Sequence, residues 1–260
     1  NGLDGAIAIG FGVSILEPIA MNLRATAATL FAFALLLPSP AEAATPITHV
    51  AIYRGPAGCD DCSENVAKAL QRLNPNYHID FVGADESIDI TPQTLARYDL
   101  YVQPGGGQDI PAALRSLGEA RSEAIRSYVA NGGRYLGLCM GAYLADDNNL
   151  GLIPQDLDGE AGRPGFEVAG SADAAVQVTW AGKADHVFFQ DGPYFPKGSY
   201  KTIATYRNGD VAAARYTYEK GVVVLSGPHP EASQQWFENA EIPVSKMPEG
   251  DLFGSLIRSF

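Results

Sequence analysis

Between residues 48 and 139, short apolar segments alternate with amphipathic ones, and this order restricts the fold more than any other feature of the sequence. Apolar runs that predict strands lie at 48–53, 77–84, 99–107 and 134–139. Segments with helical spacing of apolar residues lie at 63–73, 91–98 and 114–133. Ser63 is expected to cap the first helix, and Gly132 and Gly133 to end the last. Repeated strand–helix order favours a parallel, doubly wound sheet.

After residue 165 the pattern changes to short alternating segments. Strands are predicted at 174–180, 185–195, 201–207, 212–218 and 221–227. The segment 219–221 predicts a turn between the last two, and a final helix is expected around Trp236 and Phe237. We therefore expect residues 44–260 to form one α/β domain. Its sheet should be doubly wound and mostly parallel, with antiparallel strands in the C-terminal half.

The segment 21–43 has the pattern of a secretory signal peptide. A short polar start with Arg24 is followed by an apolar stretch to Leu37, a proline break and an A-x-A site at 41–43. We expect a secreted or periplasmic protein with no stable membrane span after signal cleavage, because the apolar run is short for a bilayer. An uncleaved anchor is the alternative. Residues 1–20 have no evident role and are expected to be an upstream extension.

Charge and composition exclude several classes of partner. The chain carries 18 lysines and arginines against 30 acidic residues, a formal net charge of −12. Nucleic acids and anionic membrane surfaces attract basic patches, so neither is expected as a partner. The four histidines are scattered without the spacing of a zinc site, and no metal or other cofactor is expected.

The pentapeptide 137–141, Gly-Leu-Cys-Met-Gly, follows a predicted strand and precedes a helix-like segment. It is the cysteine counterpart of the G-x-S-x-G elbow, which exposes a nucleophile at the end of a strand. The N-terminus of a following helix favours the thiolate form of a cysteine. Cys139 is therefore a candidate nucleophile, with a buried structural thiol as the alternative.

A base and an orienting carboxylate are available in the segment 226–231, Ser-Gly-Pro-His-Pro-Glu. His229 and Glu231 follow an apolar strand, so both are expected at the sheet edge that carries Cys139. The glycine run at 105–107 predicts an oxyanion site, with the backbone N–H groups of Gly106 and Met140 as donors. A flexible turn is the alternative for this run.

Cys59 and Cys62 form a C-x-x-C motif before the first predicted helix. Three interpretations remain open: a structural disulfide, a thioredoxin-like redox motif, or a cap or gate on Cys139. An oxidised Cys59–Cys62 pair would leave Cys139 as an unpaired thiol.

Weaker candidates flank loops at the same sheet edge. Tyr53, Arg54 and Tyr143 are expected to line a pocket there, although aromatic residues beside glycines often only pack. Asp191 is predicted to form a turn.

The segments PGGG, GGRYLGLCMGAYLA and GVVVLSGPHPE, in this order and spacing, resemble the class I glutamine amidotransferase-like superfamily. AIYRGPAGC and DGPYF resemble its branch found as the N-terminal domain of biotin–protein ligase. The resemblance covers most of residues 48–231. It implies a flavodoxin-like core with Cys139, His229 and Glu231 as a triad. It does not imply glutamine as substrate, because Tyr143 stands where glutaminases of this class usually carry a glutamine.

Three functions compete. The first is a cysteine-dependent amide hydrolase or amidotransferase-like enzyme acting on a small-molecule or peptide carboxamide. The second is a non-catalytic binding module on the same fold. The third is a thiol redox protein that works through Cys59 and Cys62. The sequence identifies no partner protein, and biotin ligation is not carried over from the resemblance.

Overall fold

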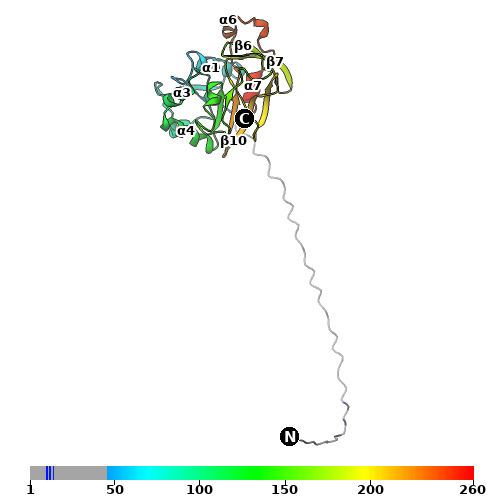
Figure 1. Ribbon diagram of the computed structural model, residues 1–260. Coiled ribbons are helices and arrows are strands. Elements are labelled where there is room, and N and C mark those ends of the chain that lie inside the picture. Colours follow the sequence, from blue (N-terminus) through cyan, green and yellow to red (C-terminus); the bar gives the residue numbers. More distant parts are fainter. Residues whose placement is uncertain (1–9, 11, 13, 15–45) are drawn as a thin grey trace, which may run out of the picture. The chain divides into compact units, whose positions relative to one another are not determined.

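The computed structural model describes residues 46–260 together with Gly10, Gly12 and Ser14, so the predicted signal peptide (21–43) lies outside the described residues. The centre of the described part is a nine-stranded sheet (Figure 1) in the order β2-β1-β3-β4-β11-β10-β9-β6-β7.

The first half of this sheet is parallel. It consists of β2 (His78–Val82), β1 (His49–Tyr53), β3 (Leu100–Gln103), β4 (Arg134–Leu138) and β11 (Gly221–Ser226), and each strand runs parallel to its neighbours within this half. The chain leaves β1 for β2 on one side and returns to β3 on the other. This strand order is the flavodoxin-like one, whose switch point lies at the carboxyl edge between β1 and β3.

The second half is antiparallel, with β10 (Val211–Tyr218), β9 (Lys201–Tyr206), β6 (Ala174–Trp180) and β7 (Lys183–Phe189). The predicted fold class is therefore confirmed. The single strand predicted at 185–195 is two strands, because the chain turns at Asp191, where φ is 49°. After the turn, β8 (Pro193–Tyr194) pairs with β5 (Asp158–Gly159) in a small separate sheet.

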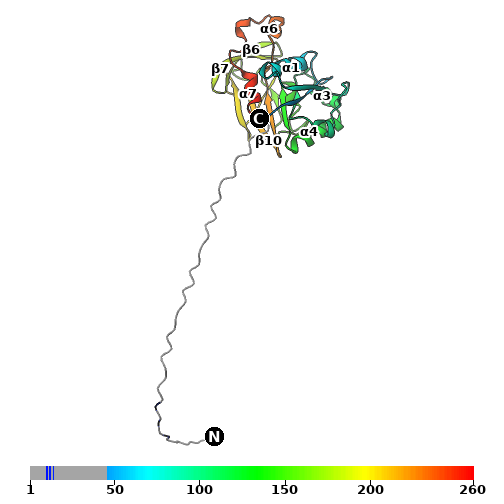
Figure 2. The same ribbon diagram turned by 180° about the vertical axis from the view of Figure 1, so that it is seen from behind.

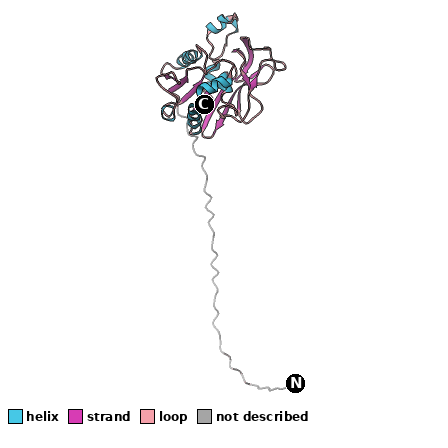
Figure 3. Cartoon of the chain, turned by 60° about the vertical axis from the view of Figure 1, so that its left-hand side comes forward, coloured by secondary structure: helices cyan, strands magenta, loops and turns pink. Residues whose placement is uncertain are grey.

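Helices cover both faces of the large sheet (Figure 3). Apolar residues of α1 (Cys62–Leu73) and α7 (Leu252–Ile257) pack in one core cluster with strand residues. Those of α2 (Pro92–Leu95), α3 (Ile110–Leu117) and α4 (Glu119–Ala130) pack in the other. In both views α3 and α4 lie at one side and β7 at the opposite side (Figure 2). None of the described helices is long and apolar enough to cross a membrane.

Two expectations about the helices are wrong. Ser63 does not cap α1, because its hydroxyl donates to the carbonyl of Tyr53 at 2.7 Å and so ties the helix to β1. The helix predicted at 114–133 is two helices, α3 and α4, separated by Gly118 with φ 78° and ψ 157°. α3 begins earlier than predicted, where the Asp109 side chain accepts from the N–H of Ala112 at 2.8 Å. By contrast, Thr91 opens α2 with a capping box, in line with its predicted place at the start of that helix.

The break at Gly118 generates a test of the fold. Its φ and ψ lie in a region that is almost restricted to glycine, while an added Cβ would have open space, with its nearest neighbour at 3.9 Å. Gly118→Ala is therefore expected to lower the free energy of unfolding by about 1–3 kcal/mol through backbone strain alone. Urea denaturation measures this loss.

Gly170→Ala is the matched control, because its φ is not positive and an added Cβ meets nothing within 4 Å. Equal effects of the two substitutions would contradict the assignment of the α3–α4 break to backbone conformation.

Candidate active site

Cys139 occupies a tight turn between β4 and the one-turn helix α5 (Met140–Tyr143). Its φ of 50° and ψ of −106° lie in a strained region for a residue with a side chain. An added Cβ on Gly137 would collide with the carbonyl of Gly141, and one on Gly141 with the carbonyl of Gln103. Glycines on both sides of Cys139 are thus required for the turn, as expected of a nucleophile elbow. Because α5 has a single turn, its dipole adds less to the site than a longer helix would.

The pairing of β11 with β4 brings the second part of the site to the elbow. The two strands are parallel, with Ser226 opposite Leu138, and the N–H of Cys139 donates to the carbonyl of Ser226 at 2.8 Å. The chain then turns away from β11, and His229 Nδ1 lies 2.8 Å from Glu231 Oε1. Both side chains are buried.

The environment of His229 keeps its imidazole protonated. The backbone N–H of His229 donates to the carbonyl of Phe188 at 2.8 Å, and the imidazole ring stands edge-on to the rings of Phe188 and Trp236. Burial lowers the pKa of His229, but the charge of Glu231, the charge of Cys139 and its hydrogen bonds to both raise it to about 10. The structure thus hydrogen-bonds His229 to Glu231 and brings Cys139 near enough for its charge to affect the imidazole.

Cys139 lies at the wall of a cavity of about 570 Å³, a volume typical of small-molecule sites. Gly106 and Met140 line the same cavity, and an added Cβ on Gly106 would lie 3.0 Å from Met140 Cγ and 2.7 Å from the carbonyl of Ala57. Met140 is the first residue of α5, so its N–H has no acceptor within the helix. The two residues predicted as oxyanion donors therefore line the same cavity as the sulfur, which donates to the backbone oxygen of Gln190 at 3.5 Å.

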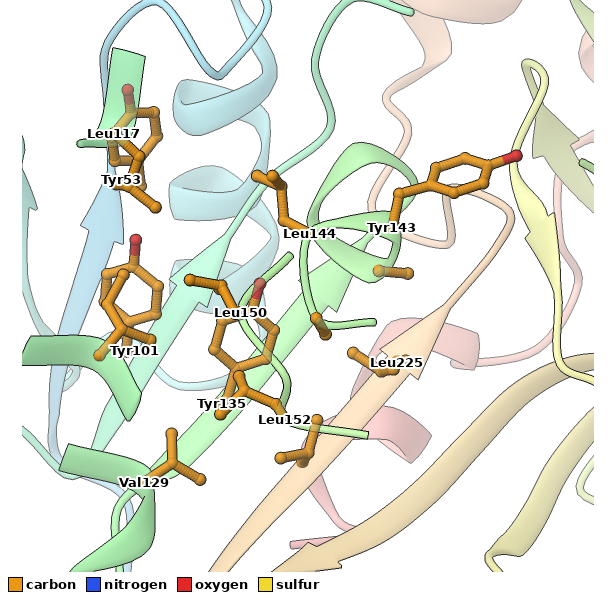
Figure 4. Packing of buried hydrophobic residues seen from close by; sticks show 14 of the residues in the cluster. Tyr53, Tyr101, Leu117, Val129, Tyr135, Tyr143, Leu144, Leu150, Leu152 and Leu225 are labelled. Carbon is orange, nitrogen blue, oxygen red and sulfur yellow. The ribbon is translucent and has the colours of Figure 1, made fainter. Parts of the chain in front are cut away.

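Of the three residues predicted to line the pocket, Tyr143 does so. Figure 4 shows its side chain directed away from the buried cluster, and its hydroxyl donates to the carbonyl of Asp191 at 3.1 Å. Tyr53 and Arg54 lie elsewhere. Tyr53 is buried, with its hydroxyl accepting from a backbone N–H four residues along the chain. Arg54 is held by Glu86 in a two-point ion pair, at 2.6 and 2.9 Å.

Cys59 and Cys62 form a disulfide, and Cys139 is free. The two sulfurs are bonded to each other and so do not cap Cys139. The disulfide lies instead on the side of the base, because an added Cβ on Gly105 would be 3.3 Å from Cys62 Sγ and 2.7 Å from His229 Cε1. A smaller cavity of about 190 Å³ is lined by both cysteines and by His229.

Asp61, inside the C-x-x-C loop, connects this loop to α6 (Gln234–Asn239). Trp236 Nε1 donates to Asp61 Oδ2 at 2.8 Å across 175 positions of sequence. The ligand atoms of Asp61 and the two cysteines also lie within 4.8 Å of one another, which is close enough for three ligands of one metal ion. Metals bind cysteine as thiolate, which a disulfide does not supply.

Several residues of the cavity were not predicted from the sequence. One wall comes from the irregular segment 157–164, and it includes Asp158 and Arg163. Asp191 forms the predicted turn and also lines the cavity. Segments without periodicity give no pattern from which their position can be predicted. The available signal was the density of glycine and charge between residues 156 and 165.

Comparison with protein families identifies the type of domain. Residues 48–173 match the family model described as "Biotin-protein ligase, N terminal". An uncharacterized protein of Chlamydia muridarum is 31% identical over 159 residues, covering 51% of this chain and 60% of the relative. Subunit HisH of imidazole glycerol phosphate synthase from Microcystis aeruginosa is 26% identical, covering 60% and 80%. The biotin–protein ligase of Schizosaccharomyces pombe is 29% identical, covering 72% and 34%. The chain thus spans 60% of the first relative and about a third of the ligase.

Solved structures with the same fold include a glutamine amidotransferase. The structure of PurLQS from Thermotoga maritima superposes with a TM-score of 0.57 at 17% identity, over 82% of this chain and 99% of that one. A crystal structure of a glutamine amidotransferase gives 0.52 at 17% identity, over 74% and 99%. At these identities the likeness establishes the fold. The resemblance seen in the sequence is thereby confirmed: residues 48–173 match the biotin–protein ligase N-terminal model, and the chain shares its fold with a solved glutamine amidotransferase.

Proposed function

We propose that this protein is a cysteine-dependent hydrolase or transferase of carboxamides. Cys139 is the nucleophile, His229 carries and returns protons, and Glu231 orients the imidazole. One observation carries the proposal: the buried His229–Glu231 contact of 2.8 Å, at an imidazole whose pKa is raised by the charges of Glu231 and of a free cysteine at the wall of a cavity. A structural thiol would have no use for a charged base buried beside it.

The raised pKa of His229 modifies the expected first step. In this step the sulfur and the imidazole share one proton, and the raised pKa of His229 favours its position on the imidazole when the sulfur attacks. The sulfur forms a bond to the carboxamide carbon, and the oxyanion is stabilised by the N–H groups of Gly106 and Met140. The carbon–nitrogen bond then breaks, and the leaving amine takes the proton from His229.

The second half of the reaction restores the site. A water molecule attacks the thioester, His229 accepts its proton, and the acyl group leaves as the acid while Cys139 returns to the thiolate. With an amine in place of water, the same steps transfer the acyl group. Hydrolysis and transfer therefore differ only in the second substrate, which is water or an amine. The carboxamide is a small molecule or a peptide in either case.

The compartment is also a proposal. A disulfide beside the active site is the state expected in an oxidising compartment, which supports secretion or a periplasmic location. It also supports a structural role for Cys59 and Cys62 over a redox cycle, since a persistent disulfide ties the loop in front of α1 to one conformation.

Labelling of Cys139 tests the proposal. A carboxamide-like alkylating probe such as chloroacetamide is expected to modify Cys139 in the wild type. His229→Gln is expected to slow the modification by about 100-fold or more, because the variant lacks the imidazole that accepts the thiol proton and activates the sulfur. Mass spectrometry of the labelled peptide gives the rate.

Glu219→Gln, at the exposed β10–β11 turn, is the control and should label like the wild type. Unchanged labelling in His229→Gln would favour the binding module. Labelling of Cys59 and Cys62 in the untreated protein would favour the redox interpretation.

The pKa of His229 also predicts how stability depends on pH. Below pH 6.5 the imidazole is protonated in both the folded and the unfolded chain, and its stabilising contribution is complete. Between pH 6.5 and pH 10 only the folded chain holds this proton, so the contribution declines as the pH rises and is lost above pH 10. The free energy of unfolding should therefore fall by up to about 1.4 kcal/mol per pH unit in this window.

Urea denaturation at pH 6.5 and pH 10 measures this slope, and His229→Gln should flatten it. The exposed Asn76 supplies the control, since Asn76→Gln changes no titratable group and should leave the slope unchanged. Equal slopes in the wild type and in His229→Gln would show that the buried imidazole does not hold the proton.

A further inference from the structure

The wall of the Cys139 cavity carries more acidic than basic side chains, and only the acidic ones lack an ion-pair partner in the described part of the chain. Asp158 and Asp191 line the cavity, and Arg163 is the basic residue in its wall among the described residues. All three come from the segments around β5 and β8, and Asp191 contacts the elbow helix α5, where its carbonyl accepts from the Tyr143 hydroxyl at 3.1 Å.

Arg163 is already neutralised. Its Nε lies 2.7 Å from Asp210 Oδ2 and 3.5 Å from Glu160 Oε2, and its guanidinium stacks at 3.6 Å on the ring of Tyr194. Glu160 is fully buried, which restricts the movement of the carboxylate beside the Arg163 guanidinium. A substrate carboxylate entering the cavity would therefore have to compete with Asp210 for the guanidinium.

The two aspartates, by contrast, have no cation beside them. No ion pair to Asp158 or Asp191 occurs in the described part of the chain, and the one hydrogen bond to the Asp158 carboxylate comes from the next backbone N–H, at 2.8 Å. Both carboxylates contribute negative charge near Tyr143 in the cavity wall. After burial and the charge of Cys139, their charges further raise the pKa of the Tyr143 hydroxyl. An added Cβ on Gly159 would lie 3.6 Å from Asp191 Oδ1 and 3.4 Å from the Tyr143 oxygen, so these groups are close.

From this imbalance we infer that the cleft selects a carboxamide whose far end carries a positive charge, an ammonium or guanidinium group held by Asp158 and Asp191. The inference rests on the proposed function for the reacting end and adds the chemistry of the recognised end. Amino-acid amides that carry a carboxylate beside the ammonium find no unengaged cation in the described wall, and purely anionic amides are repelled.

The accessibility of Cys139 to charged reagents tests the inference without requiring turnover. Cys139 is the free thiol in a sequence of three cysteines. It is treated with a methanethiosulfonate that carries a trimethylammonium group and with the sulfonate analogue of similar size, and both rates are divided by those with a small free thiol. The normalised rate should be at least about tenfold higher for the cation, and the difference should shrink in about 0.5 M salt.

Isosteric variants distinguish the effect of the two cavity carboxylates from the effect of the protein's overall negative charge. Asp158→Asn and Asp191→Asn each remove one carboxylate, and asparagine tolerates the φ of 49° at position 191. Each should lower the cation preference by about threefold or more, whereas Glu219→Gln removes the same charge from the far end of β11 and should leave it unchanged. Equal rates for the two reagents, or equal effects of all three substitutions, would overturn the inference.

Turnover supplies the second measurement. Ammonia release is compared for 6-aminohexanamide and for adipamic acid, which have similar lengths and opposite charges at the far end. A higher kcat/KM for the cationic amide supports the inference, and a preference for the anionic amide overturns it. Release from neither amide by a protein that keeps the cationic reagent preference at Cys139 would refute the amidase proposal while leaving the charge selectivity of the cleft established.

Discussion

The parallel pairing of β11 with β4 is the interaction on which the site depends. It places the end of one strand beside the elbow that ends the other, and the hydrogen bond from the N–H of Cys139 to the carbonyl of Ser226 fixes this register at its last position. A slip of one residue would turn every side chain of β11 to the opposite face. The apolar residues of β11 divide between the two core clusters, with Val223 and Leu225 in one and Val224 in the other, so such a slip is strongly disfavoured.

Around this pairing, the site is assembled from backbone as much as from side chains. Gly137, Gly141 and Gly106 each stand where an added Cβ would meet a carbonyl oxygen, so the chain approaches itself closely at three positions in the elbow and the cavity wall. This close packing holds Cys139 in its strained conformation. The strain is offset by the sheet hydrogen bonds and by the buried aromatic cluster below α5.

The parts of the fold and site that could be predicted are those marked by a pattern or motif within a short stretch of sequence. The strand–helix alternation predicted the parallel sheet, and the elbow with His229 and Glu231 predicted which residues meet, because the carboxyl ends of parallel strands share one edge. The break at Gly118 was missed, since the helical spacing continues across it and a single glycine within a helix is tolerated. The wall that carries Asp158 and Arg163 was missed because its position is set by tertiary contacts, such as that of Arg163 with Asp210, across 47 positions.

The contact between Trp236 and Asp61 has a consequence for how the protein acquires its reactivity. The elbow forms from strands that are complete by residue 141, but the imidazole, its carboxylate and the aromatic wall behind it come from residues 188–236 and close against the disulfide loop near the start of the domain. Contacts so distant in sequence form late in folding, because their loop-closure entropy is large. During synthesis the thiol is therefore made well before its partner base, and the triad is assembled only after β11 has paired with β4.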